Sequence, residues 1–150
     1  MARRRRLRWR GDLTFALTDI GQGVHSMLEY RYLHAVERPH RLPAAVRQAP
    51  VASDGRKYYL DNLYEDYDVC VELDGRQAHP DDRRWLDVRR DNAVATGGLV
   101  TLRYGWADVT SRACATAAEI AAVLRSKGWP GGPRRCGPGC KVQEPRISAR

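Results

Sequence analysis

The sequence predicts a single α/β domain in which a mixed β-sheet is flanked by helices. Its 150 residues are enough for one domain with one buried core. The composition, with 43% hydrophobic and 29% charged residues, is typical of a globular chain. Apolar residues recur at helical or strand spacing in the order helix, strand, strand, strand, helix, strand, helix. A mixed sheet of four strands, or five, follows from this order.

The first helix is expected over residues 26–37. Ser26 and Glu29 form the S-x-x-E pattern of a capping box, in which side chains satisfy the free N–H groups that open a helix. Four apolar side chains then recur at helical spacing. They are Leu28, Tyr32, Leu33 and Val36.

Three strands are expected next. Residues 46–51 and 57–63 are two apolar runs separated by a Ser-Asp-Gly turn at 53–55, which predicts a hairpin. Residues 68–74, DVCVELD, follow after a short acidic turn. Because tight connections join neighbouring antiparallel strands, we expect these three to form an antiparallel meander.

The second half of the domain alternates helix and strand. Residues 80–98 begin with Pro and Asp and end with two glycines, which is typical of a helix. Residues 99–104 are a short apolar strand, and residues 115–129 form a helix that Gly128 closes. A strand that is reached through a helix lies parallel to its predecessor. The fourth strand is therefore expected to run parallel to the third.

The two ends differ from the middle in composition. Residues 1–11 are a basic arm, and residues 130–150 are rich in Pro, Gly and Arg, so neither end is expected to pack and residues 130–150 are expected to be disordered. The folded domain is thus expected over residues 12–129. No apolar run approaches the roughly 18 residues of a membrane span, and no secretory signal is recognised. We expect a cytoplasmic protein without membrane contact.

Acidic residues on two of the expected strands form a candidate site. Side chains alternate along a strand, so Glu72 and Asp74 share one face, and Asp61 converges on Glu72 if the two strands pair. Neighbouring carboxylates repel unless a cation compensates them. Mg²⁺ (or Mn²⁺) bound by Asp61, Glu72 and the carbonyl of Leu73 could activate a water for attack on a phosphodiester. His79 is placed to act as general acid or base.

Each of these residues also has a purely structural explanation. Acidic residues on a strand are often a solvated face or a guard against aggregation at a sheet edge. His79 is equally well a surface histidine, and Glu29 the capping partner of Ser26. Arg89, Arg90 and Asp91 also fit an ordinary charged helix face.

Four stretches together resemble the restriction-endonuclease-like PD-(D/E)XK superfamily. They are GVHSMLE, YYLD, VCVELDGRQAHP and RRDNAVATGGLVTLRY. Residues 23–127 are most similar to the branch of small bacterial domains related to very short patch repair endonucleases. The positions that match this branch are Glu29, Asp61, Glu72 with Asp74, Gly75, His79, and Arg90 with Asp91.

The resemblance implies a restriction-endonuclease-like fold and an Mg²⁺-dependent endonuclease that hydrolyses phosphodiester bonds. Asp61 and Glu72 would bind the ion, Asp74 and Glu29 would assist, and His79 would move protons. DNA is the expected partner, since the net charge is +8 and clustered cations bind phosphate backbones. No small-molecule cofactor is expected. The side chains expected to contact phosphates without reading sequence are those of Arg83, Arg84, Arg89 and Arg90.

Two departures from the family leave alternatives open. The superfamily has a lysine where Asp74 stands, although Lys57 or His79 could substitute for it. The first alternative is therefore a DNA-binding or toxin–antitoxin-associated module that kept the nuclease fold and lost the chemistry. The second is a structural protein whose acidic residues are merely solvated.

The cysteines are the second departure. Very short patch repair enzymes carry a structural zinc. Here Cys136 and Cys140 lie in the tail that is expected to be disordered, and Cys70 and Cys114 are isolated in the sequence. The sequence therefore predicts no zinc.

Overall fold

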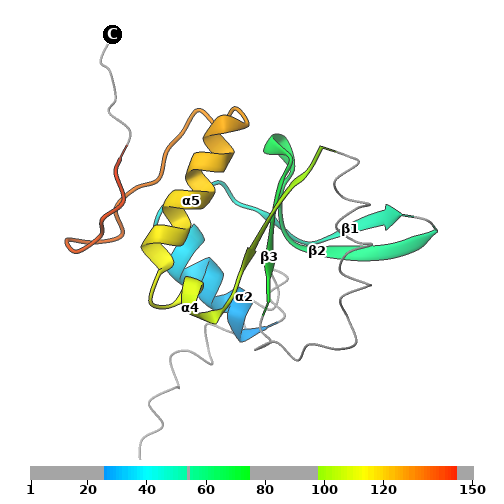
Figure 1. Ribbon diagram of the computed structural model, residues 1–150, viewed down its shortest axis with the longest axis horizontal. Coiled ribbons are helices and arrows are strands. Elements are labelled where there is room, and N and C mark those ends of the chain that lie inside the picture. The colour runs from blue at the N-terminus through cyan, green and yellow to red at the C-terminus, as the bar shows by residue number, and fades with distance from the viewer. Residues whose placement is uncertain (1–25, 54, 75–97, 145–150) are drawn as a thin grey trace, which may run out of the picture.

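The computed structural model describes residues 26–53, 55–74 and 98–144 and contains one four-stranded mixed sheet with helices packed against it (Figure 1). The elements in chain order are α2 (Met27–Arg31), the π-helical segment η1 (Tyr32–Glu37), β1 (Val46–Ser53), β2 (Arg56–Tyr64), the 3-10 turn η2 (Glu65–Tyr67), β3 (Val69–Leu73), β4 (Val100–Tyr104), α4 (Trp106–Val109) and α5 (Ala113–Ser126). The predicted α/β class is confirmed. Residues 80–97 of the expected helix over 80–98 and the ends 1–25 and 145–150 lie outside the described residues.

The sheet has the order β1-β2-β3-β4. β1 pairs antiparallel with β2, and β2 with β3. β3 and β4 are parallel, with Val69 opposite Val100 and Leu73 opposite Tyr104. The predicted meander and the predicted parallel pair are both confirmed. Figure 1 shows the helices together on one side, while the β1–β2 hairpin projects away from them.

The first helix begins where the capping pattern predicts. The Ser26 hydroxyl accepts a hydrogen bond from the Glu29 N–H at 3.1 Å. This bond satisfies one of the free donors at a helix start. The helical stretch continues without a break from α2 into η1 and buries Leu28, Tyr32 and Val36.

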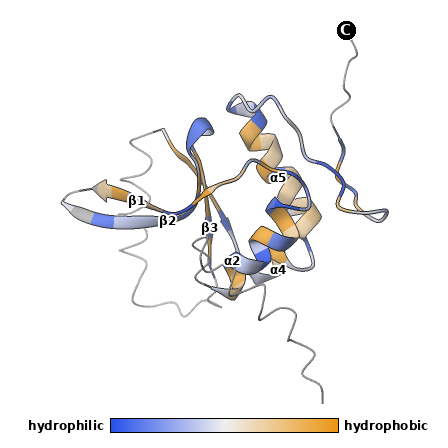
Figure 2. Ribbon diagram, turned by 180° about the vertical axis from the view of Figure 1, so that it is seen from behind, coloured by the Kyte–Doolittle hydropathy of each residue, from blue (hydrophilic) through white to orange (hydrophobic). Residues whose placement is uncertain are grey.

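Helix α5 supplies the other half of the core. It begins two residues before the predicted start, and Gly128 follows it with a φ of +100°, a conformation that suits glycine. Its buried side chains pack against β3 and the first helix, and Figure 2 shows hydrophobic residues along β3 and α5. They are Ala117, Ile120, Ala121 and Leu124.

A buried polar network joins the first helix to the hairpin. Arg47 contacts Glu37 at 2.7 Å, and Glu37 also accepts hydrogen bonds from the Ala45 N–H and the Tyr64 hydroxyl, both at 3.4 Å. The hydroxyls of Tyr32 and Tyr64 lie 2.6 Å apart. Burial raises the pKa of Glu37, and Arg47 lowers it by a smaller amount. The network therefore holds a charge pair inside the protein.

The C-terminal segment, residues 130–144, lies beside α5 in Figure 1. It was expected not to pack, but Cys140 and Val142 are 4% and 5% exposed. Their burial follows from contacts with distant parts of the chain, which composition does not reveal. Within the described ranges, no helix is both long enough and apolar enough to cross a membrane.

Candidate functional site

An open cavity of about 420 Å³ lies where the first helix, the middle of β2, the end of β3 and the start of α4 meet. Three of the predicted catalytic carboxylates line it, namely Glu29, Asp61 and Asp74. They come from three different elements, so the fold brings together residues that are far apart in the sequence. The other lining residues are Ser26, Met27, Leu28, Leu73 and Trp106.

The Asp61 carboxylate accepts hydrogen bonds from both neighbouring strands, β3 and β1. Its Oδ2 accepts the Leu73 N–H at 2.8 Å, and its Oδ1 accepts the Gln48 side-chain amide at 3.4 Å. Gln48 has a φ of +49° within β1, and it and Asp61 form no regular ladder pair. Side chains do not alternate regularly between the two faces of β2 near Asp61. Leu60 and Leu63 are three residues apart, so regular alternation would place them on opposite faces, but both pack into one hydrophobic cluster with Ala49 and Cys70.

Glu72 has a different environment from Asp61. It is 7% exposed, and the thiol of Cys70 donates a hydrogen bond to its Oε1 at 3.4 Å. Glu72 is not among the residues that line the cavity. The convergence of Asp61 and Glu72 at one site therefore stays a prediction.

The other two carboxylates lie in the first turn of α2 and directly after β3. Glu29 is 8% exposed, and its N–H is capped by Ser26. The Asp74 N–H donates to the Tyr104 carbonyl at 3.0 Å, which extends the contact of β3 with β4 by one residue. Lys57, considered as a substitute for the missing lysine, is exposed and pairs with Ala52 near the hairpin turn, away from the lining residues.

Several predicted site residues lie outside the described residues. They are Gly75, His79, Arg83, Arg84, Arg89, Arg90 and Asp91.

A second cluster corrects the predicted cofactor. In the part of the chain that the structure describes, one group of three or more potential metal ligands lies together, and it contains sulfur and nitrogen rather than carboxylate oxygen. One ligand atom from each of His40, Cys114, Cys136 and Cys140 lies within 4.8 Å of the others. The prediction of Mg²⁺ or Mn²⁺ without zinc is therefore wrong, since this donor set is typical of zinc.

The four residues reach this point from three parts of the fold. His40 follows η1, Cys114 lies in the first turn of α5, and the two remaining cysteines lie in the C-terminal segment. The Cys114 and Cys136 sulfurs are 3.6 Å apart, and the Cys140 sulfur is 3.7 Å from His40 Nε2. His40 is fully buried, whereas Cys136 is exposed. The cluster thus lies at the edge of the core.

The thiols of the cluster influence one another's ionisation. Burial raises the pKa of Cys114 to about 12, with further contributions from the thiols of Cys136 and Cys140. Burial also raises the pKa of Cys140, but the backbone N–H groups of Cys136 and Val142, followed by the two neighbouring thiols, outweigh it and lower the value to about 6. Cys140 is therefore the thiol that the structure favours as a thiolate.

Two of the four residues could have been recognised from their spacing in the sequence. Cys136 and Cys140 are spaced as C-x3-C, within the range that zinc sites use. Cys140 and His40 are 100 residues apart, however, and only the fold brings them together.

Comparisons with known proteins add no family. No family model matches the chain, and no curated protein or solved structure shows significant similarity to it.

Proposed function

We propose that this domain is a restriction-endonuclease-like nuclease that hydrolyses phosphodiester bonds of DNA at the cavity lined by Glu29, Asp61 and Asp74. The observation that carries the proposal is the position of these three carboxylates around one open cavity at the end of β3. The order of helix, three strands, strand and helix, with β4 parallel to β3, supports the fold that the resemblance implies.

The cavity has the groups that a hydrolytic reaction needs at its start. A carboxylate can accept a proton from a water as that water attacks phosphorus. Asp61 is the best placed of the three, because the Leu73 N–H and the Gln48 amide fix its orientation. A fixed orientation matters because catalysis depends on reacting groups that are already positioned.

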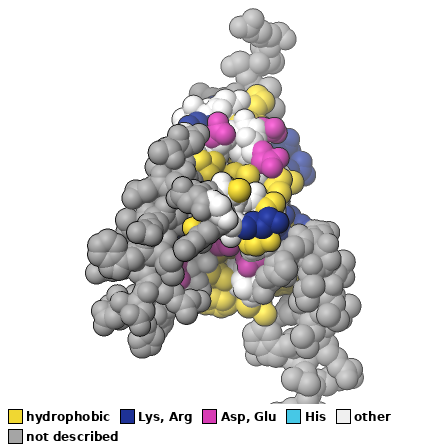
Figure 3. Space-filling view, turned by 90° about the vertical axis from the view of Figure 1, so that its right-hand side faces the viewer, with side chains coloured by type: hydrophobic (Ala, Val, Ile, Leu, Met, Phe, Trp, Pro, Cys, Tyr) yellow, Lys and Arg dark blue, Asp and Glu magenta, His cyan; other side chains and the backbone are white. Residues whose placement is uncertain are grey.

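The charge distribution supports a polyanionic substrate. The chain carries a net charge of +8, and residues 1–11 hold six arginines and no acidic residue. On the described part of the face in Figure 3, by contrast, basic and acidic side chains are interspersed. The phosphate contacts are assigned to Arg83, Arg84, Arg89 and Arg90, as the resemblance implies.

Trp106 adds an aromatic surface at the cavity. Its side chain is 51% exposed at the start of α4. Exposed aromatic rings stack on nucleobases of unpaired strands, and such stacking tolerates any sequence. This position suits a nucleic acid that is locally opened at the cavity.

The test is nicking of supercoiled plasmid by the full chain, assayed with and without a panel of added divalent cations. Asp61→Asn removes the carboxylate but keeps an oxygen that can accept the Leu73 N–H, so the fold should survive. Glu65→Gln is the matched control, because Glu65 is exposed in η2 and does not line the cavity. We expect nicking by the wild type and the control but not by Asp61→Asn. An intact plasmid under every condition, or nicking that Asp61→Asn retains, would exclude this site.

A DNA-binding module without catalysis is the second candidate. It is favoured by Asp74 at the position of the family's lysine and by the place of Glu72 beside Cys70, outside the lining of the cavity. This candidate predicts salt-dependent DNA retention that Asp61→Asn leaves unchanged. Charge reversal of Arg83, Arg84 and Arg89 together should abolish retention in a gel-shift assay.

A further inference from the structure

We propose that His40, Cys114, Cys136 and Cys140 bind one structural zinc ion, which fastens the C-terminal segment to α5 and to the turn after η1. This inference is independent of the proposed nuclease function. It rests on the chemistry of the four ligand atoms, their spacing, the orientation of His40 and the hydrogen bonds that shape the C-terminal segment.

The spacing of the ligand atoms matches a tetrahedral zinc site. With Zn–S of about 2.3 Å and Zn–N of about 2.0–2.1 Å, tetrahedral angles place two sulfurs about 3.8 Å apart and a sulfur and a nitrogen about 3.6 Å apart. The Cys114–Cys136 sulfurs are 3.6 Å apart, and the Cys140 sulfur is 3.7 Å from His40 Nε2. The remaining separations are all within 4.8 Å, so zinc would require movements of no more than about 1 Å.

His40 is oriented as a zinc ligand. Its Nδ1 lies 2.9 Å from the Val36 carbonyl oxygen, and since a carbonyl can only accept, Nδ1 must carry the proton. In the neutral ring with this tautomer, the lone pair is on Nε2, which faces the Cys140 sulfur at 3.7 Å. Histidines that bind metals commonly donate their second N–H in this way, which fixes both the tautomer and the ring.

The C-terminal segment is shaped into a ligand loop. The Cys140 N–H donates to the Gly137 carbonyl at 3.1 Å, which closes the loop between the two cysteines. The Arg135 guanidinium spans this loop, with bonds to the carbonyls of Cys140 at 3.0 Å and Pro138 at 2.9 Å. These bonds hold both cysteines in a compact turn, so less chain entropy is lost when an ion binds.

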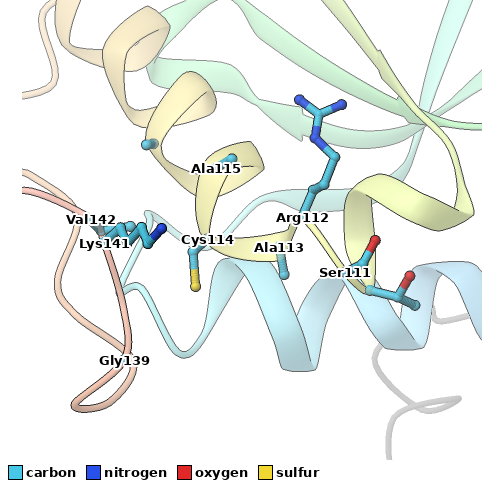
Figure 4. Close-up of a pocket in the computed structure, with 10 residues that line it drawn as sticks. Ser111, Arg112, Ala113, Cys114, Ala115, Gly139, Lys141 and Val142 are labelled. Atoms are coloured by element: carbon cyan, nitrogen blue, oxygen red, sulfur yellow. The ribbon is translucent and has the colours of Figure 1, made fainter.

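The segment also contacts the other ligand-bearing parts of the fold. The Arg134 N–H donates to the carbonyl of His40 itself at 2.8 Å. Figure 4 shows Cys114 at the start of α5, across from Lys141 and Val142 of the segment, at a cavity of about 530 Å³. An ion shared by these parts would hold the segment over this cavity.

Zinc with a structural role is the ion that fits the ligands. Three thiolates and one imidazole select a soft or borderline ion, and a tetrahedral set of four protein ligands leaves no open position for a substrate. Oxidation to a Cys114–Cys136 disulfide is the competing outcome. It would need an external oxidant and would remove two ligands together, so it is separable by experiment.

The first test measures metal in the full chain, purified under reducing conditions with zinc supplied. We expect one zinc per chain by native mass spectrometry, and a Co²⁺-substituted protein with the absorption of a tetrahedral thiolate site. Cys136→Ser should lose both signals, and the fold should survive because Cys136 is exposed. Cys70→Ala is the matched control and should keep both, since Cys70 lies outside the cluster.

Three results would overturn the proposal. They are a chain that binds no zinc, a Cys136→Ser variant that keeps one zinc and the unchanged cobalt spectrum, and a Cys114–Cys136 disulfide in the reduced, zinc-supplied protein.

The second test asks whether zinc fastens the segment. Arg134 and Arg135 are trypsin sites within it. If zinc binds only the closed state, free zinc at about 100 times its Kd should slow cleavage there roughly a hundredfold relative to the chelated protein. Equal cleavage rates would show that the ion does not hold the segment. Neither test measures DNA cleavage, so failure of the nuclease proposal would leave both results interpretable.

Discussion

Replacement of Arg47 by methionine should destabilise the domain strongly. The Arg47 and Glu37 side chains are 10% and 5% exposed, and Arg47 Nη2 lies 2.7 Å from Glu37 Oε1. Methionine fills most of the arginine's space but leaves the Glu37 carboxylate buried without its cation. The bonds from the Ala45 N–H and the Tyr64 hydroxyl, both at 3.4 Å, are too long to replace the ion pair.

Removal of one partner of a buried ion pair costs about 3–5 kcal/mol. We expect the lower end, about 3 kcal/mol, because Arg47 Nε is itself buried without a hydrogen-bond partner among the described residues and its loss is favourable. For a domain whose total stability is about 5–15 kcal/mol, this is a large fraction. The double variant Glu37→Gln/Arg47→Met should recover much of the loss, since it leaves no buried charge.

The assay is denaturant unfolding of the reduced, metal-loaded protein, followed by tryptophan fluorescence and circular dichroism. Arg125→Met is the control, because Arg125 is exposed on α5 and its loss should change the free energy of unfolding by no more than about 0.5 kcal/mol. A cost for Arg47→Met of less than about 1 kcal/mol, or a double variant less stable than the single one, would refute the reasoning.

Two further predictions concern pH and packing. Burial raises the pKa of Glu37 in the folded protein above the ordinary value of 4.5, and Arg47 opposes this effect only in part. The folded state therefore favours the protonated carboxyl. This favourable contribution to the free energy of unfolding is complete below pH 4.5 and is lost as the pH rises through the pKa of the folded protein. The stability of the wild type relative to Glu37→Gln should thus fall as pH rises in unfolding experiments, and a rise would contradict the assignment. A Cβ at Gly131 would lie 2.6 Å from the Trp129 indole, so Gly131→Ala should cost about 1–3 kcal/mol and shift the Trp129 indole N–H resonance. Gly137→Ala, where no atom lies within 4 Å, is its control, and equal behaviour of the two variants would disprove the close contact.

The sequence alone determined the local elements and their order. The cap at Ser26 and the glycine at position 128 mark the start of the first helix and the end of α5, because helix ends depend on neighbouring N–H and carbonyl groups. The parallel direction of β4 was predictable because a crossover of a dozen or more residues with a helical pattern is typical of parallel neighbours. Glu29, Asp61 and Asp74 were likewise chosen from the sequence as candidate site residues, and all three line one cavity.

Only the tertiary structure decided which side chains meet. Regular alternation predicted that Glu72 would join Asp61; the structure shows the Cys70 thiol donating to Glu72 and does not place Glu72 among the residues that line the cavity with Asp61. Composition predicted an unpacked tail, but Cys140 is buried in contact with His40 and completes a cluster of four potential metal ligands. Periodicity and composition report on neighbours along the chain, whereas a site depends on how distant elements pack together, and that packing is decided only when the core forms.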